Sequence, residues 1–166
     1  MIAVDTVLRE RVGAFYAYET MLLDENRLRE WLELIDDDVR YIMPMRETRL
    51  GPPSQNDNPT FYLYNDDKDS LVTRVARLET GMALVESPPS ATQRLVTDVL
   101  VLGAGPVHVD VRSSFLVLQV RDERNETTFG GRRTDRLRIT ADGFRLLRRD
   151  ILLVHYVLPR TVSMFF

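Results

Sequence analysis

The sequence contains no cysteine and very little of the usual catalytic chemistry, with only two histidines and one tryptophan among its 166 residues. Without cysteine the chain cannot form disulfides, attack a substrate with a thiolate or hold a metal through sulfur. No G-x-S-x-G elbow occurs, and neither Gly103-Ala104-Gly105 nor Gly130-Gly131 precedes a helical pattern that could bind phosphate. The common signatures of nucleophilic and phosphate-binding enzymes are therefore missing.

An excess of one charge and a long apolar run are also missing. With 22 basic and 25 acidic residues, the chain offers no electrostatic footprint for nucleic acid or an anionic membrane. No segment approaches the ~20 apolar residues of a membrane span, and the N-terminus has no basic segment followed by an apolar run. We expect a cytoplasmic protein that folds as one domain over residues 1–166.

Long alternating patterns dominate the C-terminal half. Three long strands are predicted, at Val107–Arg121, Glu126–Thr140 and Phe144–Leu158, in an antiparallel meander with turn-rich connections. Strands of about fifteen residues span roughly 50 Å, so the sheet must twist and curl. Val39–Met45 and Ala91–Leu102 read as further strands, which makes about five in all.

Helical periodicity occurs only upstream of the meander. Three helices are predicted, at Val4–Met21, Glu25–Ile35 and Lys68–Met82. Asp24 is placed to cap the second helix, and Asp69 or Ser70 the third. A curled sheet has a concave side that must be filled, so the predicted fold is α+β, a curved antiparallel sheet with helices packed in its curl.

Several side chains allow more local predictions. Trp31 lies on the apolar stripe of its helix and is expected in the core. The run Asp36-Asp37-Asp38 lacks the spaced ligands of a calcium loop and is expected at a solvated corner. In the last hairpin, a three-residue turn over Ala141–Gly143 sets Asp135 opposite Arg149 and avoids a pair of opposed aspartates, so we predict that register.

The two histidines suggest one sharp alternative. His108-Val109-Asp110 with the distal His155 has the spacing style of a two-histidine, one-carboxylate iron site, because a strand places His108 and Asp110 on one face. Such oxygenases usually need a double-sheet barrel of about eight strands, which exceeds the number predicted here. A three-residue match is also a weak motif, so the iron site is disfavoured.

The last residues, Ser163-Met164-Phe165-Phe166, carry two aromatics that a solvated terminus rarely has. We expect this segment to be docked, either in the chain's own core or against a neighbour, where a buried aromatic can anchor an interface. One broad face of the sheet should remain uncovered by helices, and such a face usually marks a protein contact. A homotrimeric contact of this chain with itself is expected there.

A specific combination of motifs extends over nearly the whole chain. Its segments are Leu22-Leu23-Asp24, Trp31-Leu32, Asp36–Tyr41, Met43–Arg46, Leu71 with Arg74–Gly81, Glu86–Ser90, Phe129–Leu137 and Arg149–Phe166. This combination closely resembles the small (beta) subunits of aromatic-ring-hydroxylating dioxygenases. One departure is Val154, where that family commonly carries an acidic residue, and it affects a local contact rather than the assignment.

The resemblance implies a cone-shaped α+β fold of the NTF2-like, or cystatin-like, class. It also implies a partner, the large (alpha) subunit, which holds a Rieske [2Fe–2S] cluster and a mononuclear Fe(II), in a hexamer of three large and three small chains. The implied function is a non-catalytic part in converting an aromatic compound to a cis-dihydrodiol with O2 and electrons from NAD(P)H. A Rieske centre needs two cysteines, so the cluster cannot lie in this chain.

An enzymatic alternative remains open. The same cone in other families encloses a cavity with an acid–base pair, as in small dehydratases and isomerases, and His108, Asp110 or His155 could serve it here. If the chain is instead a subunit, it should contain no catalytic, cofactor-binding or metal-binding residues. The interface candidates are then Trp31, Arg74, Arg94, Arg132, Phe165 and Phe166.

Overall fold

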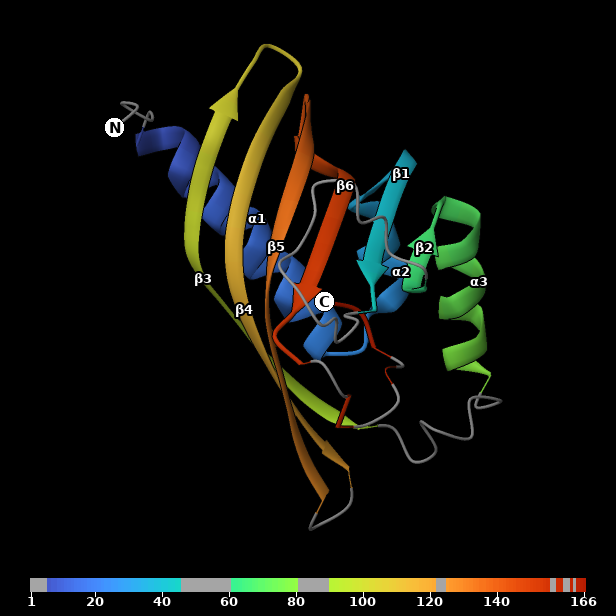
Figure 1. The fold of residues 1–166 in the computed structure, drawn as a ribbon. Coiled ribbons are helices and arrows are strands. Elements are labelled where there is room, and N and C mark those ends of the chain that lie inside the picture. The colour runs from blue at the N-terminus through green and yellow to red at the C-terminus, as the bar shows by residue number, and fades with distance from the viewer. Residues whose placement is uncertain are drawn as a thin grey trace.

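The computed structural model describes residues 6–45, 61–80, 90–121, 125–155, 158–159, 162 and 164–166. A single curved sheet contains six strands in the order β2-β1-β6-β5-β4-β3, and Figure 1 shows α1 and α2 behind this sheet. The elements are α1 (Thr6–Asp24), α2 (Leu28–Glu33), β1 (Ile35–Pro44), β2 (Tyr62–Asp66), α3 (Lys68–Glu79), β3 (Ala91–Ala104), β4 (His108–Arg121), β5 (Asn125–Thr140) and β6 (Gly143–Leu153). The predicted α+β class, with helices packed in the curl of a sheet, is confirmed.

The long meander follows the predicted strands closely. β4, β5 and β6 pair antiparallel in sequence order, and β6 ends at Leu153 rather than at Leu158. Two features were not predicted, the short strand β2 at one edge and the parallel pairing of β1 with β6. A parallel neighbour needs a crossover, and here α3 and β3–β5 lie between β1 and β6 in the chain.

Curvature is built into the strands at irregular positions. β3 changes register against β4 between Thr97 and Leu100, where Asp98 has a left-handed backbone (φ 52°). A bulge of this kind bends its strand and increases the local twist. Figure 1 shows β3, β4 and β5 sweeping along one side of α1, so the concave face of the curl receives the helix.

The register of the last hairpin is as predicted, although the turn is not. Asp135 lies opposite Arg149, but the turn is the two-residue Ala141-Asp142, with Thr140 opposite Gly143. A register shift beyond Arg136 restores the favourable pairing. The tight turn is possible because Gly143 adopts φ 144°, a conformation that side-chain-bearing residues rarely adopt.

Two predicted helix caps are wrong. Asp24 does not cap α2, because its carboxylate accepts hydrogen bonds from the backbone and side chain of Arg94 on β3. The N-cap of α3 is Asp67, whose carboxylate accepts from the Ser70 backbone N–H at 2.9 Å, rather than Asp69 or Ser70 itself. At α2, the contact with Arg94 therefore overrides the capping preference of Asp24. At α3, an aspartate does cap the helix, but it lies two residues before the predicted Asp69.

The predicted solvated corner at Asp36-Asp37-Asp38 is partly wrong. These residues belong to β1, and Asp36 is buried. Its carboxylate lies 3.3 Å from Nε of Arg138, while Asp38 accepts from the same guanidinium at 3.1 Å. The run therefore holds the end of β5 by ion pairing. Residues 86–89, which make up most of the resemblance segment Glu86–Ser90, lie outside the described part of the chain, as do residues 50–59.

Candidate functional site

The concave interior holds a compact group of buried charges, here called the inner ion network. It consists of Glu19 on α1, Arg133 and Asp135 on β5, and Arg149 on β6, each at most 2% exposed. Arg149 donates to both carboxylates, with Nη1 2.8 Å from Glu19 Oε1 and Nη2 2.8 Å from Asp135 Oδ2. The helix is thereby joined to the two central strands by charge-assisted hydrogen bonds.

The second arginine completes the charge balance. Arg133 Nη2 lies 3.3 Å from Glu19 Oε2, and its Nε donates to the Ser113 hydroxyl at 3.2 Å. Tyr16 donates its hydroxyl to Asp135 at 2.9 Å and places its ring 4.7 Å from the Arg133 guanidinium. Two cations face two anions, which is the condition under which buried charges are tolerated.

The pKa values of Glu19, Arg149 and the adjacent Tyr16 are shifted away from neutral pH. Burial alone would raise the pKa of Glu19, but Arg149 and Arg133 outweigh it, and the pKa is lowered from its ordinary value. Burial alone would lower the pKa of Arg149, but Asp135 and Glu19 raise it well above its ordinary value. Burial, followed by Asp135, raises the pKa of Tyr16 well above normal. A general acid or base needs a pKa near the working pH, so these three shifts favour a structural role.

Residues from the end of the sequence also pack in the interior, beside the inner ion network. The ring of Phe165 stacks on Trp31 at 4.4 Å between centroids, and the ring of Phe166 packs against Phe115 and Phe129. Both phenylalanines are nearly fully buried. Of the two alternatives for this segment, burial in the chain's own core is therefore the one observed.

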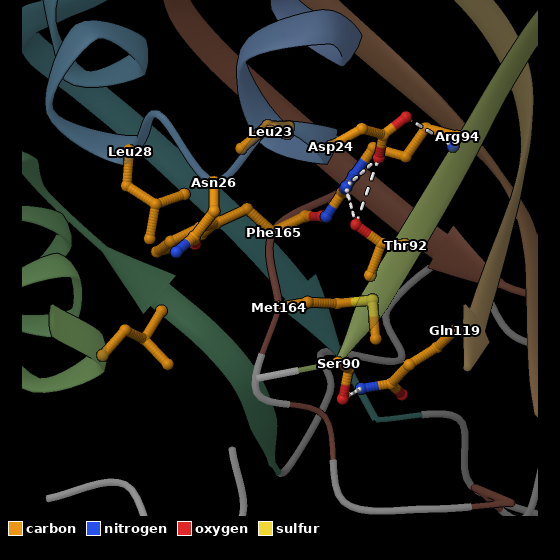
Figure 2. A pocket seen from close by; sticks show the side chains of 11 residues that line it. Leu23, Asp24, Asn26, Leu28, Ser90, Thr92, Arg94, Gln119, Met164 and Phe165 are labelled. Carbon is orange, nitrogen blue, oxygen red and sulfur yellow. Dashed lines mark hydrogen bonds and ion pairs between the residues drawn. The ribbon is translucent and has the colours of Figure 1, made fainter. Parts of the chain in front are cut away.

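In the part of the chain that the structure describes, a small pocket lies beside this packing (Figure 2). Its volume is about 80 Å³, and its lining includes Asp24, Thr92, Arg94, Met164 and Phe165. Figure 2 shows Asp24, Thr92 and Arg94 joined by hydrogen bonds. Pockets for organic ligands are typically about 300–1,000 Å³, so this one suits a few water molecules rather than a substrate.

The three residues of the enzymatic alternative are not brought together. His108 and Asp110 occupy the positions of β4 that alternate with the buried ones, and Asp110 is bound by Arg136 at 2.7 Å. His155 lies beside Phe129, whereas His108 pairs with Arg138. Nine positions of β5 separate these two partners, or roughly 30 Å. The described residues therefore form no shared acid–base site from this set.

No metal site is found either within the part of the chain that the structure describes. There, no three histidine, aspartate or glutamate side chains gather closely enough to hold a metal ion. No described helix is long and apolar enough to cross a membrane.

The convex side of the sheet, here called the outer face, has a different character. Its exposed leucines lie on β3 and β4: Leu95, Leu100, Leu102 and Leu116. Beside them run exposed ion pairs, between Asp110 and Arg136 and between Arg148 and Asp150. Figure 1 shows the described helices behind this face or at the edge beside β2. A wide, partly apolar face without helical cover is typical of a protein contact.

The structure places the six interface candidates in two groups. Trp31, Arg94, Phe165 and Phe166 are buried within the chain, where their side chains serve its own core. Arg132 is exposed on β5, and Arg74 is partly exposed beside Asp66. Only the second group has side chains exposed on the surface of the chain. Contact with another chain remains a prediction for both groups.

The main residues that sequence reasoning missed are Glu19, Tyr16 and Arg133. Glu19 interrupts the apolar stripe of α1, whose neighbours Val12, Phe15 and Leu22 are all buried. A charged residue on a buried helical stripe is expected to have a charged partner. That position was therefore a usable signal, although it did not identify the partner.

Comparison with known proteins places this architecture in a family. The profile of the family described as ring hydroxylating beta subunit matches residues 18–160. Among solved structures, a chain of naphthalene 1,2-dioxygenase with indole bound in the active site has 21% identity and a TM-score of 0.88, covering 99% of this chain and 88% of that one. The beta subunit of the benzoate 1,2-dioxygenase of Burkholderia mallei has 22% identity and a TM-score of 0.70, with coverage of 92% and 93%.

A third similar structure has a different name. A Novosphingobium aromaticivorans protein provisionally named a scytalone dehydratase has 14% identity and a TM-score of 0.66, covering 92% of this chain and 89% of that one. This likeness supports the NTF2-like fold but carries no function at such identity. Since the family profile covers most of the sequence, the chain belongs to the ring-hydroxylating dioxygenase beta subunit family.

Proposed function

We propose that this chain is the non-catalytic, structural small subunit of a multicomponent aromatic-ring-hydroxylating dioxygenase. The large (alpha) subunit of this complex carries the Rieske [2Fe–2S] cluster and the mononuclear Fe(II), and it converts an aromatic compound to a cis-dihydrodiol with O2 and electrons from NAD(P)H. Three large and three small chains assemble in the cytoplasm for aromatic catabolism. Membership of the beta subunit family supports this role.

The filled interior is the observation that carries the non-catalytic part of the proposal. In the described residues, the space inside the cone is occupied by the inner ion network and by a core of apolar side chains that includes Phe165 and Phe166, and the pocket beside them is about 80 Å³. An enzyme of this fold would need a substrate-sized cavity with a titrating acid–base pair. The described part of the interior offers neither, which supports a structural role for this chain.

The outer face supports the assembly part of the proposal. Leu95 and Leu116 are opposite each other on β3 and β4, and both are more than two-fifths exposed. β3 is also an edge strand, and an exposed apolar edge is normally covered by a neighbour or blunted by charge. We place the homotrimeric contact on this face, with the large subunit bound to the resulting trimer.

Co-expression with the cognate large subunit tests the proposal. Light scattering should give the mass of a hexamer for the complex and of a trimer for the small chain alone. The purified small chain, supplied with iron and a reductant, should form no cis-dihydrodiol. A stable monomer in both samples would contradict the assembly, and ring oxygenation by the isolated chain would contradict the non-catalytic role.

A substitution on the outer face sharpens this experiment. Leu95→Asp places a charge at an exposed position, so it should leave the fold intact and shift the mass toward the monomer. The matched control is Tyr18→Asp, at a position on α1 that is similarly exposed. If both variants assemble to the same mass as the unchanged chain, the contact lies elsewhere.

A further inference from the structure

We propose that the concave interior is a peptide-binding site whose resident ligand is the chain's own segment Met164–Phe166, and that this segment can be replaced by a short peptide of the same sequence. The binding site is formed by side chains of all six strands together with Trp31 of α2. The inference concerns the small chain by itself and goes beyond its part in the assembly proposed above.

The backbone of Met164–Phe166 is hydrogen-bonded by side chains of the surrounding strands, as the backbone of a bound peptide would be. A core segment normally satisfies its backbone groups within a helix or a strand ladder. Here, side chains bind the three carbonyl oxygens. Tyr64 donates to Met164 at 2.8 Å, Arg94 donates to Phe165 through Nε at 3.1 Å and Nη2 at 2.8 Å, and Arg149 Nη1 donates to Phe166 at 2.6 Å.

Tyr41 adds a two-way contact to the same end of the segment. Its hydroxyl donates to the Phe166 carbonyl oxygen at 2.7 Å and accepts from the Phe166 backbone N–H at 2.8 Å. Such paired recognition of a backbone by fixed side chains fits an extended peptide and selects its register.

The two rings supply apolar anchoring. Phe165 stacks on Trp31 at an interplanar angle of 26° and meets the ring of Tyr41 edge-on. Phe166 lies in a separate cluster with Phe115 and Phe129. Aromatic anchors in well-packed pockets dominate the binding energy of most interfaces, so a ligand for this site needs two adjacent aromatic residues.

The two arginines of the site are also held in place by partners other than the segment. Arg149 is already bound by Glu19 and Asp135, and the Arg94 guanidinium is bound by Asp24. Removing the segment therefore leaves each arginine paired with a carboxylate and aimed at the vacated space. A site that keeps its geometry when empty is preorganised for binding.

The direct test uses the chain shortened to residues 1–163 and the peptide acetyl-Met-Phe-Phe-amide. Trp31 is the only tryptophan and stacks on Phe165, so its fluorescence reports occupation of the site. We expect saturable one-to-one binding with a rise in Tm as the peptide concentration increases. Acetyl-Met-Ala-Ala-amide should cause neither change.

Variants of the shortened chain test the contacts. Tyr41→Phe removes both hydrogen bonds to Phe166 and should weaken peptide binding about tenfold. Tyr18→Phe makes the same change at an exposed position and should leave the affinity unchanged. Equal affinities for the two variants would overturn the proposed site, as would a folded shortened chain that binds no peptide.

If the shortened chain does not fold even with peptide present, a full-length variant tests the proposal instead. Phe165→Ala keeps the backbone contacts and vacates the space beside Trp31, and apolar cavities of this kind bind small aromatics. We expect toluene to raise the Tm of this variant in a saturable way and to change Trp31 fluorescence, with no effect on the unchanged chain. If toluene has no effect on the variant, the segment is a fixed part of the core and the proposal is wrong.

Discussion

Arg148 and Arg149 are neighbours in β6, yet they occupy opposite faces of the sheet and different electrostatic environments. Arg149 is fully buried and binds Glu19 and Asp135, while the side chain of Arg148 is 49% exposed and pairs with Asp150. Successive residues of a strand point to opposite faces, so two identical side chains experience very different screening by water.

This difference assigns separate tasks to the two faces. Breaking a buried ion pair leaves an unpaired charge in the interior, which is strongly unfavourable. The inner ion network therefore holds α1 against the sheet in one arrangement. Exposed ion pairs contribute little to folding, which leaves the outer face free to exchange its contacts for those of a partner. The largest expected effects therefore come from the inner face.

Replacing Arg148 and Arg149 one at a time is the strongest test of the difference between the two faces. Arg149→Met leaves Glu19 and Asp135 buried with only Arg133 to balance them, and should lower the free energy of unfolding by about 3–5 kcal/mol. Arg148→Met removes an exposed pair and should lower it by less than about 1 kcal/mol. Urea unfolding of both variants measures the difference, and similar losses would show that burial does not separate the two faces.

Acid should weaken the inner ion network through Glu19, whose pKa is lowered in the folded chain. A group with a lowered folded pKa stabilises the fold above its unfolded pKa of about 4.3, and this contribution is lost as the pH falls through the folded value. Glu19→Gln removes the contribution. The variant should therefore be less stable at neutral pH, by less than Arg149→Met, because glutamine keeps the size and one hydrogen-bond acceptor.

The pH dependence distinguishes this loss from a packing defect. The difference in unfolding free energy between the unchanged chain and Glu19→Gln should narrow as the pH falls below about 4.3. Glu10→Gln, the same change at an exposed position of α1, controls for the loss of a surface charge. A difference that stays constant down to the acid transition would show that Glu19 acts through shape alone.

Gly130 and Gly131 are neighbours in β5 and allow the inner and outer faces to be compared without any change of charge. A Cβ at Gly131 would lie 2.5 Å from the Leu152 carbonyl oxygen and 2.8 Å from Cζ of Phe115. The nearest atom to a Cβ at Gly130 is at 3.8 Å, an ordinary contact. Gly131→Ala should therefore cost about 1–3 kcal/mol by overpacking, while Gly130→Ala should stay within about 0.5 kcal/mol. Thermal unfolding of the two variants gives the answer, and equal stabilities would mean that the backbone at Leu152 yields easily.

Local patterns predicted much of the fold and little of the interior. The strands β4 to β6 and the helix α1 follow from periodicity, and the Asp135–Arg149 register followed from charges facing each other across one hairpin. Glu19 and Arg149, in contrast, are 130 residues apart. Nothing local to either residue identifies the other, because their contact depends on how α1 lies in the curl.

Asp24, which does not cap α2 as predicted, shows that a distant contact can also make a local prediction wrong. An aspartate before a helix has a real capping preference, worth about 1 kcal/mol. The guanidinium of Arg94, 70 residues away, offers a charge-assisted hydrogen bond in a buried setting, and such bonds are roughly twice as strong as neutral ones. A distant partner therefore overrides the local preference.

The smallest expected effect belongs to the ion pair between Asp110 and Arg136 on the outer face. The pair has good geometry, with two hydrogen bonds of 2.7 and 3.2 Å, but its side chains are 40% and 50% exposed. A double-mutant cycle with Asp110→Asn and Arg136→Met should give a coupling below about 1 kcal/mol.

Salt is the test that tells this pair from the inner one. The Debye length falls from about 10 Å at 0.1 M to about 3 Å at 1 M salt, so the coupling of the exposed pair should nearly vanish at the higher concentration. The loss caused by Arg149→Met should change little between the two conditions, because water and ions do not reach Glu19. A coupling between Asp110 and Arg136 that persists at 1 M salt would mean that the outer face is shielded from solvent, as it would be inside an oligomer. Repeating the cycle with Leu95→Asp in the background then separates shielding by assembly from an unusually strong surface pair, since only the first is abolished when the contact is broken.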